Sequence, residues 1–141
     1  MRASEVRAKI VEAVEGASVD AQASRTDVFT HLEVGTREIR AGRDRLFVVT
    51  VGSIPLRSGR MFPTDSYSGS WDVTVMYADS PQIEDRICKD VERIAQALEV
   101  LPGENADIHT IDLMGGPIDE FDGRVTATLT AQIGYRLTAG V

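Results

Sequence analysis

Residues 80–101 read SPQIEDRICKDVERIAQALEVL, and this stretch decides the expected fold. Its apolar residues recur at steps of three or four, which draws one apolar stripe along a helix of 3.6 residues per turn. The stripe consists of Ile83, Ile87, Val91, Ile94, Leu98 and Leu101. A long amphipathic helix is therefore predicted, and it needs an apolar surface to cover.

The ends of this helix carry recognisable signals. Ser80 is the expected N-cap, and Pro81 suits the first helical turn, where its missing amide would have no helical partner. Pro102-Gly103 is expected to end the helix, because proline cannot continue the amide ladder.

The side of the helix opposite the stripe is charged. Asp85/Lys89 and Arg86/Asp90 are spaced four residues apart, which predicts ion pairs on a solvated face. Cys88 lies beside the stripe and is expected to serve as a small apolar residue.

Upstream of the helix the patterns alternate between helix and strand. Residues 4–15 predict a short amphipathic helix that ends at Gly16. Strands are expected at 28–34 and 46–51, and again at 71–78, where apolar and polar residues alternate.

Downstream of the helix a shorter strand is expected at 108–114, ended by Gly115-Gly116-Pro117 and followed by an acidic turn at 118–123. The closing stretch 124–137 alternates throughout and predicts the clearest strand. Its polar side includes a row of threonines that would meet water or another subunit: Thr126, Thr128 and Thr130. The residues expected to face inward are Trp71, Val73, Val75, Tyr77, Val125, Leu129 and Ile133.

This order of elements predicts an α+β fold. Residues 1–141 are expected to form a single domain, with a mostly antiparallel β-sheet covered by the long helix 80–101 and the short N-terminal helix 4–15. Between two of the strands, residues 53–70 are rich in proline, glycine and serine and predict a long loop that is either flexible or part of an interface.

Composition narrows the classes of function. Fifteen basic and 22 acidic residues leave a formal charge of −7, which argues against a protein that grips nucleic acid by its phosphates. A single cysteine excludes an internal disulfide and a thiol-based zinc site. No apolar run is long enough to span a membrane, and the N-terminus lacks the features of a signal peptide, so we expect the protein to be cytosolic where it is made.

No pattern of residues predicts a reaction. His109 lies near Asp107 and Asp112, but strand alternation would send Asp112 to the other face, so a metal site is not expected. The acidic turn lacks the spacing of a calcium loop, and nucleophile and phosphate-binding motifs are absent. We therefore expect no catalytic residue, no cofactor and no metal, and hence no enzyme.

The order of elements resembles that of bacteriophage tail terminator, or tail-completion, proteins. The resemblance rests on the N-terminal helix, the long loop, the strand WDVTVMY with its YADSP turn into the long helix, and the final strand VTATLTAQIGYRL. It covers nearly the whole chain and depends on order and length rather than on an invariant motif.

The resemblance implies a structural virion protein. Such proteins form a ring, commonly hexameric, at the head-proximal end of the tail tube, where they stop tube polymerisation and provide the joining surface for the neck. The implied partners are further copies of the chain, the tail tube protein and a neck or head-completion protein. DNA would pass through the lumen without specific binding, no membrane would be involved, and the protein would move from the host cytoplasm into the virion.

In a ring of this kind, one patch of each subunit meets a different patch on the next. We expect the loop to contact a neighbouring subunit or the tail tube through Arg57, Arg60, Met61 and Phe62, because apolar and basic side chains are unusual in a plain linker. The rival interpretations are a head–tail connector or neck adaptor, a component of a phage-derived injection machine and, in a different class, a small α+β ligand-binding domain or enzyme.

Overall fold

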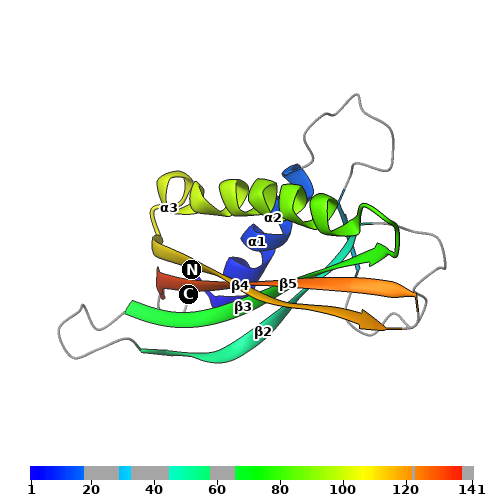
Figure 1. The fold of residues 1–141 in the computed structure, drawn as a ribbon. Helices are drawn as coiled ribbons and strands as arrows, with labels where there is room; N and C mark the ends of the chain where they lie inside the picture. Colours follow the sequence, from blue (N-terminus) through cyan, green and yellow to red (C-terminus); the bar gives the residue numbers. More distant parts are fainter. Residues whose placement is uncertain (18–28, 33–44, 58–65, 122, 138–141) are drawn as a thin grey trace.

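The computed structural model describes residues 1–17, 29–32, 45–57, 66–121 and 123–137. Within these residues, one twisted sheet carries helices on a single face (Figure 1). In chain order the elements are α1 (Ala3–Gly16), β1 (Thr30–His31), β2 (Leu46–Arg57), β3 (Ser66–Ala78), α2 (Ile83–Glu99), α3 (Leu101–Glu104), β4 (Ile108–Phe121) and β5 (Arg124–Arg136).

The strands are arranged in the order β1-β2-β3-β5-β4. β1 pairs with β2 in parallel, and the other three pairings are antiparallel. The predicted α+β class is therefore confirmed: a mostly antiparallel sheet lies under one long helix and a short N-terminal helix.

The apolar stripe of α2 packs onto this sheet as predicted. Ile87, Ile94 and Leu98 are buried, and Leu101 continues the stripe into α3. Ile83 and Val91 are partly buried against the same core. Cys88, in contrast, is exposed, so the prediction that it fills an apolar site is wrong.

The predicted ends of the long helix are shifted. α2 begins at Ile83 rather than beside Ser80, whose buried hydroxyl has no hydrogen-bond partner among the described residues. It ends at Glu99, and Pro102 then lies in the first turn of the short helix α3. Proline fits that turn for the same reason that it would have stopped α2, namely its missing amide.

The core lies between the sheet and the helices. All seven residues expected to face inward from β3 and β5 are buried. From the other side, α1 contributes Val6, Ile10 and Val14. Trp71 meets the ring of Tyr135 edge-on, with the ring centroids 6.1 Å apart. None of the described helices is both long enough and apolar enough to cross a membrane.

The region expected to be a loop at 53–70 is largely strand, which corrects the prediction. β2 extends to Arg57 and β3 starts at Ser66, leaving 58–65 outside the described residues. Two register shifts, between Val51 and Ser53 and between Ser53 and Leu56, accommodate the glycine and the proline of this stretch. Proline and glycine content alone was therefore a misleading signal here.

The predicted break at Gly115-Gly116-Pro117 is also wrong, because β4 continues through it to Phe121. A register shift between Gly115 and Ile118 absorbs the irregularity. At Gly116, a Cβ atom would lie 2.7 Å from the carbonyl oxygen of Thr128, so only glycine allows this close approach. The expected acidic turn shrinks to the connection around Gly123, whose φ is 74°.

The first expected strand is shorter than predicted. Only Thr30 and His31 pair, while Phe29 beside them is buried at 1% exposure. Residues 28, 33 and 34 of the predicted strand lie outside the described residues, whereas Leu32 is described and donates its amide to the Phe47 carbonyl at 2.8 Å. Arg45, which directly precedes β2, is buried.

Candidate interaction surface

The face of the sheet that points away from the helices is not covered by any described element (Figure 1). We call it the open face. Strand alternation and register place these side chains on it: Val48, Thr50, Ser53, Ser70, Asp72, Thr74, Met76, Asp112, Met114, Thr126, Thr128, Thr130 and Gln132. The threonine row predicted for β5 therefore points away from the core.

Hydroxyl groups on the open face bond across the strands. The hydroxyls of Thr74 and Thr128 lie 3.2 Å apart, and Thr130 Oγ1 donates to Asp72 Oδ1 at 2.7 Å. The face is thus polar with few charges. Such a surface is compatible both with water and with another protein.

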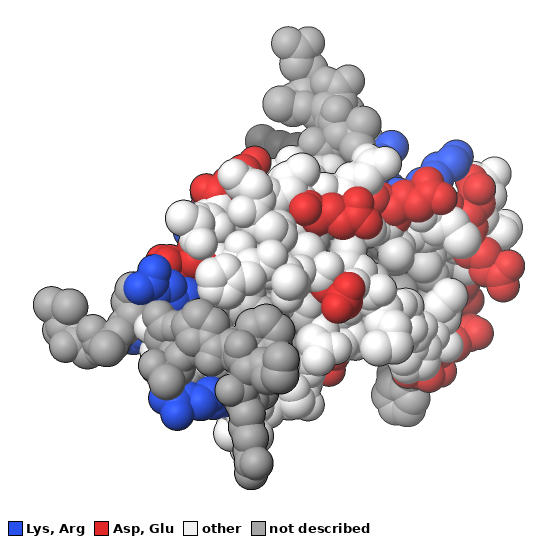
Figure 2. Space-filling model, turned by 90° about the vertical axis from the view of Figure 1, so that its left-hand side faces the viewer, with Lys and Arg blue, Asp and Glu red and all other residues white. Residues whose placement is uncertain are grey.

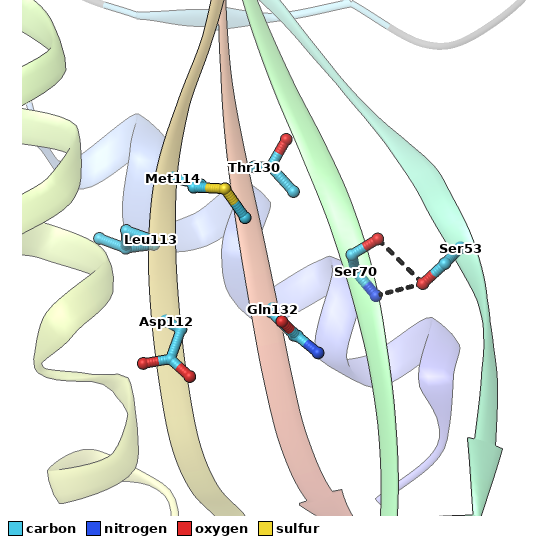
Figure 3. A pocket seen from close by; sticks show the side chains of 7 residues that line it. All are labelled: Ser53, Ser70, Asp112, Leu113, Met114, Thr130 and Gln132. Atoms are coloured by element: carbon cyan, nitrogen blue, oxygen red, sulfur yellow. Dashed lines mark hydrogen bonds between the residues drawn. The ribbon is translucent and has the colours of Figure 1, made fainter.

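A shallow pocket of about 260 Å³ lies on the open face (Figure 3). It is lined by Ser53, Ser70, Asp112, Leu113, Met114, Thr130 and Gln132. Ser70 donates from both its amide and its hydroxyl to Ser53 Oγ, at 3.1 and 2.9 Å. The lining offers hydrogen-bonding groups and one carboxylate, but no histidine, cysteine or lysine that would form a nucleophile–base pair.

The second feature is the projecting end of the β2–β3 hairpin, Val51–Arg57 with Ser66–Ser70, which we call the arm. It forms the left-hand end of the sheet in Figure 1. Three large apolar side chains of the arm are exposed: Val51 at 55%, Ile54 at 78% and Leu56 at 68%. Exposed apolar residues that gather on one segment indicate a surface for a partner.

The interface residues expected from the sequence fall in or beside the arm. Arg57 is exposed at the end of β2, opposite Tyr67. Arg60, Met61 and Phe62 lie outside the described residues. The interface role of these four residues stays a prediction. Ile54 and Leu56, the exposed apolar side chains of the arm, were not among them.

Charge is unevenly distributed between the two edge strands. β2 contains no acidic residue and ends in Arg57, whereas β4 contains no lysine or arginine and exposes Asp112, Asp119 and Glu120. Figure 2 shows the end of the molecule from which the arm projects, with acidic side chains gathered at its right-hand margin and basic ones at lower left.

Beneath α2 lies a buried polar cluster that the sequence analysis missed. Asp90 is fully buried; Arg45 Nε donates to its Oδ2 at 2.8 Å and Tyr77 Oη donates to the same atom at 2.9 Å. The predicted Arg86/Asp90 surface pair is therefore wrong, and Arg86 instead lies over the Tyr77 ring, 5.8 Å from its centroid. The other predicted pair is confirmed, with Lys89 Nζ 3.0 Å from Asp85 Oδ2.

This cluster joins three elements rather than forming an accessible site. Burial raises the pKa of Tyr77 far above its usual value, and the neighbouring carboxylate of Asp90 raises it further, while Arg45 and Arg86 act in the opposite direction. Arg45 has a φ of 56°, a conformation in which a side chain is strained. A signal for Asp90 was present: it stands three residues after Ile87 and four before Ile94, on the apolar stripe.

The histidines do not assemble a site. A register shift between Ile108 and Thr110 interrupts the alternation assumed for His109, which is exposed. His31 packs near Phe47, with the ring centroids 5.2 Å apart. In the described part of the chain, no three histidine, cysteine or acidic side chains come together as metal ligands.

No family model matches the chain, and no curated protein matches it.

Proposed function

We propose that this chain is a structural protein of a phage tail. It forms a ring, hexameric as in the proteins it resembles, at the head-proximal end of the tail tube, stops tube polymerisation and offers a joining surface for the neck. The resemblance described from the sequence motivates this proposal, and the fold class agrees with it.

The observation that carries the proposal is the arm. Its exposed apolar side chains, led by Ile54 and Leu56, would be costly to leave in water and gain from a protein partner. The arm is built from paired strands with defined register, so it presents those side chains on a firm support. A ring-forming protein needs a surface of this kind on every subunit.

The net charge supports the lumen expected for such a ring. At −7, the chain repels rather than binds the phosphates of DNA, which suits a channel through which DNA passes without specific contacts. The partners proposed are the neighbouring copies, the tail tube protein and a neck or head-completion protein.

Two measurements test the proposal together. Light scattering of the purified chain alone should give a mass several times 15.4 kDa, and mixing it with the tail tube protein of the same virus should give a complex heavier than either component. Electron microscopy should show rings with a central hole at one end of the tubes. A chain that stays monomeric at high concentration and leaves tube length unchanged would refute the proposal.

A pair of variants makes this test specific to the arm. Ile54→Ser with Leu56→Ser should reduce assembly without unfolding the chain, because both side chains are exposed in the monomer. Val100→Ser is the control, since Val100 is 49% exposed but lies between α2 and α3 rather than on the arm. Equal assembly by the two variants would contradict the role of the arm.

The open-face pocket favours a second candidate, a small ligand-binding domain. Its hydroxyl, amide and carboxylate groups converge on one depression. The space between sheet and helices, where folds of this kind often place a ligand, is filled by core side chains such as Trp71 and Tyr135. A ligand that raises the Tm of the wild type, but not of Gln132→Ala, would favour this candidate over the ring.

A further inference from the structure

The two free edges of the sheet are complementary to each other. In the strand order, β2 beyond Phe47 lies at one edge of the described sheet and β4 at the other. A sheet edge presents backbone and side-chain groups that another strand can cover. Both edges carry exposed apolar side chains, and their charges are opposite.

On the β2 side, the edge becomes free where the arm begins. The carbonyl oxygens of Arg45 and Phe47 accept the amides of Thr30 and Leu32, at 3.0 and 2.8 Å, and that of Val49 accepts Arg7 Nε at 3.0 Å. From Val51 onward, no described residue covers the edge. The free edge and the exposed apolar side chains of the arm therefore coincide.

On the β4 side, the edge offers the matching chemistry. Met114 is 65% exposed and Ile118 is 57% exposed. Between and beside them stand the exposed carboxylates of Asp112, Asp119 and Glu120.

We propose that the arm of one subunit lies against the β4 edge of the next subunit. Ile54 would pack near Ile118 and Leu56 near Met114, and Arg57 would meet the carboxylate of Asp112. The occupant is a second copy of this chain, because every copy carries both the arm and the β4 edge. The arm ends in a basic residue and the β4 edge is acidic, so the two surfaces have opposite charges. This inference rests on the proposed ring and names the contact that builds it.

Strand direction allows this arrangement. Each step from β2 to β3, β5 and β4 reverses direction, so the β2 of a similarly oriented copy runs antiparallel to β4. The contact joins two different patches, which generates a ring if the rotation closes. Pro55 and Pro117 lack amide donors and interrupt the backbone ladder at this contact, so side chains supply most of it and unlimited sheet growth is opposed.

Disulfide cross-linking tests the contact directly. In a Cys88→Ser background, which removes the natural cysteine, Leu56→Cys and Met114→Cys are made separately and together. An equimolar mixture of the two single variants should form covalent dimers under mild oxidation, and the double variant should form a ladder of higher species. The matched control combines Glu84→Cys with Glu99→Cys, two exposed positions on α2 that have no place in the contact.

Charge reversal gives an independent readout. Arg57→Glu should shift the mass measured by light scattering from the assembly toward the 15.4 kDa monomer, and adding Asp112→Arg should restore the assembly. Both experiments are run with the chain alone and in the presence of tail tubes. Cross-linking no higher than in the control under either condition, or Leu56→Cys alone dimerising as well as the mixture, would overturn the inference.

The outcomes separate this inference from the proposed function. Rings that cap tubes without the arm–β4 cross-link would refute the contact and leave the ring in place. Cross-linked ladders from a protein that neither closes into rings nor caps tubes would support the contact and refute the role in the tail.

Discussion

The buried cluster of Arg45, Tyr77 and Asp90 permits a quantitative prediction. Asp90→Asn preserves the volume of the side chain and removes its charge, so Arg45, only 7% exposed, loses the buried carboxylate that its Nε contacts at 2.8 Å. Removing one partner of a buried ion pair typically costs about 3–5 kcal/mol. The hydrogen bond from Tyr77 to Oδ2 also changes from a charged to a neutral acceptor.

This loss is a large fraction of the free energy of unfolding of a whole domain, which is about 5–15 kcal/mol. With an unfolding entropy of about 2.1 cal/mol/K per residue, the Tm of this chain should fall by roughly 10–17 °C. The assay is built into the molecule: Trp71 is the only tryptophan and is 1% exposed, so its fluorescence reports unfolding in urea.

A surface pair provides the control. Asp85→Asn breaks the contact with Lys89, whose side chain is 65% exposed, and should cost less than about 0.5 kcal/mol. A double-mutant cycle completes the test: Arg45→Met should cost much less in the Asp90→Asn background than in the wild type, because the guanidinium has then already lost the Asp90 carboxylate. This reasoning would be refuted by an Asp90→Asn variant whose free energy of unfolding lies within 1 kcal/mol of the wild type, a margin about twice an error of about 0.5 kcal/mol. Strictly additive costs in the double-mutant cycle would also refute it.

Three further predictions follow from the structure. The folded pKa of Tyr77 is raised above its unfolded value near 10. The contribution of Tyr77 to stability is therefore complete below pH about 10 and falls by about 1.4 kcal/mol per pH unit above it. The free energy of unfolding of Tyr77→Phe, measured in urea from pH 8 to 11, should fall less steeply than that of the wild type. Gly116→Ala should lower the free energy of unfolding by about 1–3 kcal/mol, because the new Cβ would collide with the Thr128 carbonyl. At Gly115 a Cβ meets nothing within 4 Å, so Gly115→Ala should unfold close to the wild type. Equal urea midpoints for the two variants would contradict the close approach at Gly116. Trp71→Ala should lower the free energy of unfolding by about 3–5 kcal/mol when followed by circular dichroism, and a smaller loss would mean that the core closes around the missing ring.

Much of the fold could be predicted from short-range patterns. The apolar stripe of α2 and the alternation of β5 were sufficient to place both elements and to identify which side of each is buried. The period of a helix or strand repeats within a few residues, so the apolar residues of a buried face can be recognised from the sequence alone. The α+β class followed from the order of these elements.

Predictions that depended on turn signals were less successful. Gly115-Gly116-Pro117 and the stretch around Pro55 were interpreted as breaks, yet both are strand with shifted register. Glycine and proline restrict the local backbone, but a neighbouring strand can still be paired through a bulge. Whether such a neighbour exists depends on residues far away in the chain.

The candidate surface, too, was predictable from the sequence only in part. The sequence pointed to the region around Arg57 as an interface, and the apolar character of Ile54 and Leu56 was visible in it. Their exposure was not, because the extent of the helix layer over the sheet is a tertiary property. The opposite charges of β2 and β4 became meaningful only when the strand order placed these strands at the two edges.

The sequence by itself therefore determined the long helix, the closing strand, their buried faces and the fold class, since these depend on periodicity over one or two turns or a few strand residues. Only the tertiary structure decided that Asp90 is buried against Arg45 and Tyr77, and that the arm remains uncovered. Burial and charge pairing depend on which side chains meet across the fold, and residues 13 to 45 positions apart meet in this cluster. The local pattern of residues does not predict contacts between positions so far apart in the sequence.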